Sequence, residues 1–189
     1  MNAVTPKRLL LHVCCGPCAT ASLERLRAQG EVTLFYSNAN IHPAAEYAKR
    51  LEQVRLLAAA CACELVEDTY DHAAWRAWIR GLEAELEGGA RCRRCFEYSL
   101  RRAARYAAEH GYSGLTTSLT ISPHKRSADI FAVGRQVTDL FLDVDFKRAD
   151  GFRRSLELSE QYGLYRQDYC GCEFSLAESE PRRQRRQRA

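Results

Sequence analysis

The sequence predicts an α/β fold in which a parallel β-sheet is covered by helices on both faces. Two observations carry this prediction. Short apolar or β-branched runs alternate along the chain with longer segments whose apolar residues recur at helical spacing. Polar loops with chemically reactive side chains follow most of the predicted strands, and the carboxyl ends of parallel strands meet at one edge of a sheet. The 189 residues are enough for one domain with a sizeable core.

The first predicted strand and helix flank a turn that is rich in cysteine. Residues 9–13 form an apolar run short enough for a buried strand, and residues 19–28 carry alanines and leucines at helical spacing. Residues 31–36 are rich in β-branched and aromatic side chains, which predicts the second strand. After a turn-rich loop, residues 44–60 place their apolar side chains on one face, as a helix does.

The middle of the chain continues the alternation. Residues 64–67 are predicted to form a short third strand, and Asp71 caps a helix that runs through Leu82. A long helix is expected over residues 92–110, with Gly111 as its C-terminal stop.

Two more strands and one helix complete the predicted domain. Residues 115–118 form the fourth strand, residues 128–138 a helix, and residues 140–145 the fifth strand. Because strands and helices alternate throughout, we expect a Rossmann-like sheet whose functional loops lie at the carboxyl ends of the strands.

Charge and composition divide the chain unevenly. The formal net charge is +4, but residues 178–189 hold five arginines and two glutamates, which leaves the preceding residues nearly neutral. We therefore expect one Rossmann-like catalytic domain over residues 1–176 and a basic, disordered tail over residues 177–189 that either touches RNA phosphates or only aids solubility. No signal peptide or stretch of about 20 apolar residues is present, so we expect a cytoplasmic protein with no membrane partner.

Nine cysteines are the most distinctive part of the composition. In a reducing compartment, clustered thiols indicate metal or redox chemistry rather than a disulfide scaffold. Cys14, Cys15 and Cys18 lie between the first strand and the first helix, where the helix N-terminus favours thiolates. Cys61 and Cys63 lie among alanines, and we interpret these two as packing residues.

The remaining cysteines offer partners for the first cluster. Cys92 and Cys95 are one helical turn apart, so with Cys14 and Cys15 they could hold an iron–sulfur cluster or, equally by ligand type, zinc. A disulfide within Cys170-Gly171-Cys172 would be strained, which favours a redox pair, or else these two ligate a second metal together with Cys18. Seven thiols are many for a structural zinc site in one small domain, so iron and electron transfer are favoured.

Several motifs resemble those of one known family, the cobalamin-independent epoxyqueuosine reductases called QueH. The resemblance covers about residues 8–175. It is carried by the cysteine-rich turn, by Asn40-Ile41-His42-Pro43 and by strings at 91–95, 116–125, 145–147 and 164–172. The last string, LYRQDYCGC, is the most specific.

The resemblance implies a Rossmann-like fold related to the adenine-nucleotide α-hydrolase (HUP-like) group. It implies a [4Fe–4S] oxidoreductase that reduces epoxyqueuosine in the tRNA anticodon to queuosine, the last step of queuosine biosynthesis. By motif, the cluster ligands would be Cys14, Cys15, Cys92 and Cys95. Cys170 and Cys172 would form a redox-active pair or, with Cys18, hold a second, mononuclear iron. The substrate partner would be tRNA, and the electron donor is left open.

Two other functions are compatible with parts of the pattern. An iron–sulfur enzyme of related fold that thiolates tRNA would need a phosphate-binding loop for ATP after the first strand, where Cys-Cys-Gly-Pro-Cys stands instead. A non-catalytic zinc protein that binds RNA is the second alternative. For proton transfer in a reductase, the candidate donors from the same loops are His12, His42, His124, Lys125 and Tyr169.

Overall fold

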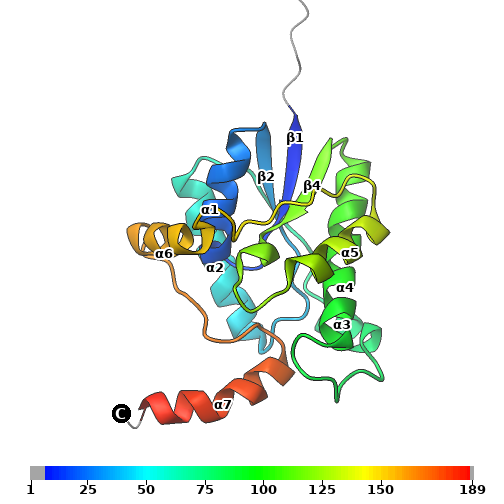
Figure 1. Cartoon of the computed structure of the whole chain (residues 1–189), viewed down its shortest axis with the longest axis vertical. Helices are drawn as coiled ribbons and strands as arrows, with labels where there is room; N and C mark the ends of the chain where they lie inside the picture. The colour runs from blue at the N-terminus through cyan, green and yellow to red at the C-terminus, as the bar shows by residue number, and fades with distance from the viewer. Residues whose placement is uncertain (1–6, 188–189) are drawn as a thin grey trace, which may run out of the picture.

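The computed structural model describes the backbone of residues 7–187 and the side chains of residues 7–180. Its centre is a parallel sheet of four strands in the order β3-β2-β1-β4 (Figure 1). The strands are β1 (Arg8–His12), β2 (Glu31–Tyr36), β3 (Leu65–Glu67) and β4 (Gly114–Thr117). The predicted α/β class, with a parallel Rossmann-like sheet, is confirmed.

Helices cover both faces of this sheet (Figure 1). One face carries α1 (Gly16–Arg27), α2 (Ala44–Ala60) and α6 (Gly151–Gln161), and the other carries α4 (Ala90–Glu109) and α5 (Ser127–Val137). The short α3 (His72–Trp78) packs against α4. Because side chains alternate along a strand, Leu9 and Leu11 enter the core beneath α1 whereas Leu10 enters the core beneath α4.

The prediction of a fifth strand is wrong. Residues 140–145 run beside β4, but only one parallel bridge forms, between Leu115 and Phe141. Beyond that point, two threonine hydroxyls donate to the backbone carbonyls that would otherwise accept from a neighbouring strand. Thr116 Oγ1 donates to Leu142 O at 3.0 Å, and Thr120 Oγ1 donates to Val144 O at 2.8 Å. Side-chain hydrogen bonds thus replace the ladder that would extend the strand.

The C-terminal third differs most from the expectation. The sequence did not predict α6, nor α7 (Glu173–Gln187), which replaces the expected disordered segment from residue 177 as far as Gln187. The glutamates, arginines and glutamines of this segment favour a helix, and its first turn is anchored by buried Ser175. Residues 188–189 lie outside the described part of the chain. No helix in the described residues is long and apolar enough to cross a membrane.

Candidate metal centre

Three thiols of the β1–α1 turn form a compact group. Cys15 is the N-cap of α1, and its sulfur accepts a hydrogen bond from Cys18 N at 3.4 Å, so the turn folds the two cysteines toward each other. The sulfurs of Cys14, Cys15 and Cys18 all lie within 4.8 Å of one another. Gly16 is required because a Cβ there would lie 2.6 Å from Gln53 O of α2. This spacing and donor type fit a metal that prefers sulfur ligands.

The surroundings of this group favour ionisation of its central thiol, Cys15. Burial opposes ionisation of Cys15, but hydrogen bonds from the neighbouring thiols and from Gln167 Nε2 hold its pKa well below the ordinary value, and the Arg50 charge acts in the same direction. The hydrogen bond with Cys15 raises the pKa of Cys14 to about 11, and the hydrogen bond with Cys14 raises the pKa of Cys18. A thiol whose ionisation is favoured, with two further sulfurs beside it, is a starting point for metal binding.

Four further thiols come from α4 and from the segment before α7. Cys92 and Cys95 lie in the first two turns of α4. Burial raises the pKa of both, and the charges of Cys170 and Cys172 raise it further. All nine cysteines of the chain are free thiols.

Both thiol groups contribute to one cavity of about 800 Å³ at the carboxyl ends of the strands. Its walls include Cys14 and Cys18 of the β1–α1 turn, Cys95 of α4, and Cys170. Of the predicted four-cysteine ligand set, Cys14 and Cys95 line this cavity. Among the described side chains, the compact group contains Cys18 in place of the two α4 cysteines.

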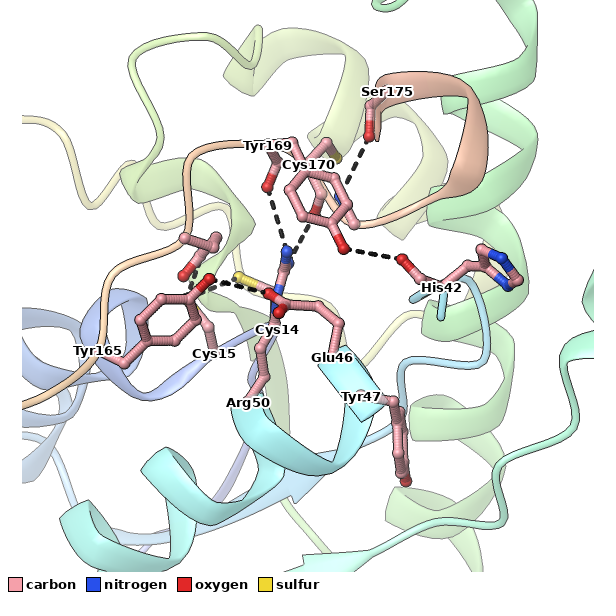
Figure 2. Close-up of polar contacts among 12 residues, drawn as sticks. Cys14, Cys15, His42, Glu46, Tyr47, Arg50, Tyr165, Tyr169, Cys170 and Ser175 are labelled. Carbon is pink, nitrogen blue, oxygen red and sulfur yellow. Dashed lines mark hydrogen bonds and ion pairs between the residues drawn. The ribbon is translucent and has the colours of Figure 1, made fainter. Parts of the chain in front are cut away.

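A buried arginine of α2 connects the two cysteine-bearing segments (Figure 2). Arg50 Nη1 donates to Cys170 O at 2.9 Å, Nη2 donates to Tyr169 O at 3.3 Å, and Nε donates to Glu46 Oε1 at 2.7 Å. Its side chain is only 1% exposed, so the pair with Glu46 is formed away from bulk water. The same guanidinium favours the Cys15 thiolate. Arg50 thus fixes the backbone of the Cys170 segment relative to α2.

The Cys170 segment is also attached to the loop after β2. Tyr169 Oη donates to His42 O at 2.7 Å, and His42 N donates to Gly171 O at 2.8 Å (Figure 2). Gly171 has φ of 141°, where other residues are strained, and a Cβ there would lie 3.1 Å from the Arg50 guanidinium. The glycine between the two cysteines is thus explained by its backbone conformation and by the packing of Arg50.

His12 lines the cavity but is a neutral structural residue. Its Nε2 lies 3.1 Å from Ser37 O, which can only accept, so Nε2 carries the hydrogen and Nδ1 accepts from Thr117 Oγ1 at 2.8 Å. Burial holds the pKa of His12 below its ordinary value. With both ring nitrogens engaged, this side chain joins β1 to the loop after β2 and to the end of β4, so it is a satisfied core histidine rather than one of the candidate proton donors.

Lys125 is a cation that lines the cavity. Its Nζ donates to the Cys170 sulfur at 3.2 Å. Burial opposes the charge, but the nearby Cys170 and Cys14 raise the pKa of Lys125 above its ordinary value. The loop that carries it is held by Lys147, whose Nζ donates to Thr120 O at 2.8 Å and to Lys125 O at 2.9 Å. His124 also lines the cavity.

Cys61 and Cys63 lie apart from the cavity, where they pack against the core beneath α1. Cys63 Sγ lies 3.0 Å from Val32 O, and Cys61 Sγ lies 3.7 Å from Tyr162 Oη. Their interpretation as packing residues is confirmed.

Sequence reasoning assigned no role to Arg50 or Gln167, which contact the cysteine segments from 120 and 152 residues away. Gln167 stands inside the LYRQDYCGC string, which was the one signal that could have drawn attention to it. Arg50 carried no local signal, because a helical arginine is ordinarily exposed.

Comparison with known proteins identifies the family. The family model described as epoxyqueuosine reductase QueH matches residues 9–178. A protein of Streptococcus pyogenes named epoxyqueuosine reductase QueH is 41% identical over 177 residues, which cover 88% of this chain and 69% of that protein. Proteins with the same name from Staphylococcus epidermidis and Thermotoga maritima are 36% and 32% identical over 89% and 90% of this chain, and the matches cover 76% and 91% of those proteins. The chain belongs to the epoxyqueuosine reductase QueH family.

Proposed function

We propose that this chain reduces the epoxide of epoxyqueuosine in tRNA to the alkene of queuosine. Its support is the family membership together with one observation: thiols from three distant segments line a single cavity at the ligand-binding edge of the sheet. The proposed partners are a tRNA that carries epoxyqueuosine and an electron donor that is not identified. The proposed location is the cytoplasm, where thiols stay reduced.

The proposed cofactor is a [4Fe–4S] cluster, with a second, mononuclear iron as a further candidate. We propose Cys14, Cys15, Cys92 and Cys95 as the cluster ligands, and Cys18, Cys170 and Cys172 as ligands of the second iron. A redox-active pair of Cys170 and Cys172 is the alternative role for the last two. Cys15 supports this assignment because its thiolate is favoured before any metal is bound, and thiolates are the form that iron–sulfur sites require.

The reaction consumes two electrons and two protons. Both C–O bonds of the epoxide break, a C=C bond forms, the two carbons are reduced, and the oxygen leaves as water. When bound, the iron–sulfur group would supply electrons singly, and an iron with an open position would polarise a C–O bond. A cavity of about 800 Å³ is large enough to receive a modified nucleobase that has left its stack.

The residues of the chain would stabilise and protonate the departing oxygen. Lys125 is half-buried and lines the cavity, and its pKa is held above the ordinary value, so it can donate a hydrogen bond to an alkoxide that develops there. Arg50 holds the Cys170 backbone in place and thereby keeps the Cys170 sulfur beside Lys125. His124, from the same loop, is the second candidate proton donor.

Nucleoside mass spectrometry tests this proposal in cells. A bacterial host that lacks its own epoxyqueuosine reductase and is grown without cobalamin receives the chain or its Cys92→Ala variant. We expect queuosine in tRNA with the intact chain and epoxyqueuosine with the variant. Epoxyqueuosine that persists despite intact, iron-containing protein would contradict the proposal.

A further inference from the structure

The loop after β2 contains a polar side chain that the fold does not use. Asn40 lines the cavity and is only 9% exposed. Asparagines in turns commonly hydrogen-bond to nearby backbone, but the Asn40 amide has no hydrogen-bond partner in the described part of the chain. Its carbonyl oxygen and its amino group are therefore both available to a ligand in the cavity.

The backbone that carries Asn40 is held on both sides. Before it, Asn38 Nδ2 donates to Val13 O at 2.8 Å, and after it, His42 N donates to Gly171 O at 2.8 Å. Asn40 itself does not have a positive φ, so its backbone does not require the tolerance of left-handed conformations that asparagine offers. The position thus combines a fixed backbone with an amide that has no structural task.

The Asn40 amide lies beside the candidate redox pair. A Cβ on Gly171 would lie 3.5 Å from Asn40 Nδ2, and Gly171 separates Cys170 from Cys172. Cys170 also lines the cavity. A ligand group that binds Asn40 is therefore close to thiols proposed to take part in the reduction. In the proposed substrate, the group that must come close to them is the ring that carries the epoxide.

This ring has hydroxyl groups that match an amide. In epoxyqueuosine the two epoxide carbons belong to a cyclopentane ring that also bears two neighbouring hydroxyls. A hydroxyl both donates and accepts hydrogen bonds, and a carboxamide does the same through Oδ1 and Nδ2. A site that hydrogen-bonds a substrate hydroxyl discriminates against a substrate that lacks it, because the polar group of the protein is then left unpaired. An unmodified guanosine has no such ring.

We propose that the Asn40 amide binds the ring hydroxyls of epoxyqueuosine and so holds the epoxide beside the Cys170 segment. The inference rests on the proposed function, from which it takes its substrate. Asn40 is then a specificity residue, which distinguishes tRNA that carries the modified base from tRNA that carries guanosine at the same position.

Binding measurements with two tRNAs test the proposal. The iron-loaded chain, left unreduced so that no turnover occurs, is titrated with tRNA that carries epoxyqueuosine and with the same tRNA that carries guanosine instead. The ratio of the two dissociation constants removes changes in general RNA affinity. We expect wild type to prefer the modified tRNA and Asn40→Leu, which is similar in shape but cannot hydrogen-bond, to lose roughly 5- to 10-fold of that preference. Asn40→Asp, which still accepts from hydroxyls, should keep more of it.

The outcomes separate this inference from the proposed function. A wild-type preference that Asn40→Leu retains in full would overturn the inference and leave the proposed function standing. Equal affinity of the wild-type chain for both tRNAs would contradict the proposed substrate and the inference with it.

A second measurement needs neither iron nor tRNA. Because the Asn40 amide has no partner in the described part of the chain, Asn40→Leu should unfold at the same urea concentration as wild type or at a higher one. Asn38→Leu is the matched control from the same loop, since it removes the hydrogen bond to Val13 O and should unfold at a clearly lower concentration. If Asn40→Leu were destabilised as much as Asn38→Leu, the amide would have a structural role and the inference would be overturned.

Discussion

The Lys125 ammonium donates a hydrogen bond to the Cys170 sulfur across 3.2 Å, which joins the loop after β4 to the segment before α7. Both residues line the cavity, and they lie 45 residues apart in the chain. The contact places a permanent positive charge beside a thiol of the candidate redox pair. At this contact, a cation therefore lies beside a candidate redox thiol in the wall of the cavity.

Replacing Lys125 by Met should slow the reaction while leaving the protein folded. Loss of a hydrogen bond to a charged group costs about 1.5–3 kcal/mol, which corresponds to roughly a 10- to 100-fold lower single-turnover rate if it acts in the transition state. Lys49→Met, which removes an exposed lysine, is the matched control. Equal rates in the two variants would show that the Cys170 contact has no part in turnover.

The cysteines should separate into two classes by iron content. Replacing Cys14, Cys15, Cys92 or Cys95 by Ala should remove most of the bound iron, because each is a proposed cluster ligand. Cys61→Ala and Cys63→Ala should keep the iron and the visible absorbance, since both pack against the core away from the cavity.

Cys170→Ala and Cys172→Ala should retain most of the cluster and bind tRNA but lose turnover. If a Cys61 variant lost its iron while Cys92→Ala kept it, the ligand assignment would be wrong. Iron and sulfide analysis of anaerobically purified proteins makes the comparison.

Asp68 should give the fold a measurable dependence on pH. Burial opposes its charge, but the ion pair with Arg102 and the hydrogen bond from Ser37 Oγ hold the pKa of Asp68 below its ordinary value of 3.8. A carboxyl whose pKa is lowered by folding stabilises the folded state above pH 3.8, and this contribution is lost as the pH falls through the folded-state value.

Asp68→Asn should therefore reduce the free energy of unfolding by about 1–3 kcal/mol at pH 7, and the difference should shrink below about pH 4. Urea unfolding of the metal-free proteins measures it. Asp150→Asn, in an exposed pair with Arg153, should change little at either pH. A deficit for Asp68→Asn that is equally large at pH 3 and pH 7 would argue against the ion pair as its cause.

The five C-terminal arginines should add to RNA affinity without contributing to chemistry. Each phosphate contact steepens the salt dependence of binding by about 0.7–0.9 in log–log slope. A chain truncated after Ser179 should bind tRNA more weakly at low salt, with a shallower slope, and should turn over bound substrate at the same rate. Superimposable salt titrations would show that the arginines do not contact RNA.

The sheet and its first helices were predictable because their signals are local. The apolar run that became β1 and the Gly111 stop after α4 depend on a few adjacent residues. Helix α6 could not be predicted in this way. It packs against α1, but its buried side chains include the small polar Ser155 and Ser159, which leave no apolar stripe in the sequence.

The site residues also divide into those that a local sequence signal predicts and those that it does not. The β1–α1 turn could be predicted to draw Cys14, Cys15 and Cys18 together, since an N-cap and the residues after it are close in sequence. Arg50 could not be assigned, because what it does depends on partners that only the folded chain supplies.

The central claim is tested most directly by one reaction with purified components. The anaerobically reconstituted chain, chemically reduced, is mixed with tRNA that carries epoxyqueuosine, in the absence of cobalamin and ATP. The nucleosides are then analysed by mass spectrometry. The account predicts stoichiometric loss of epoxyqueuosine and appearance of queuosine; unchanged epoxyqueuosine with folded, iron-loaded and reduced protein would contradict it.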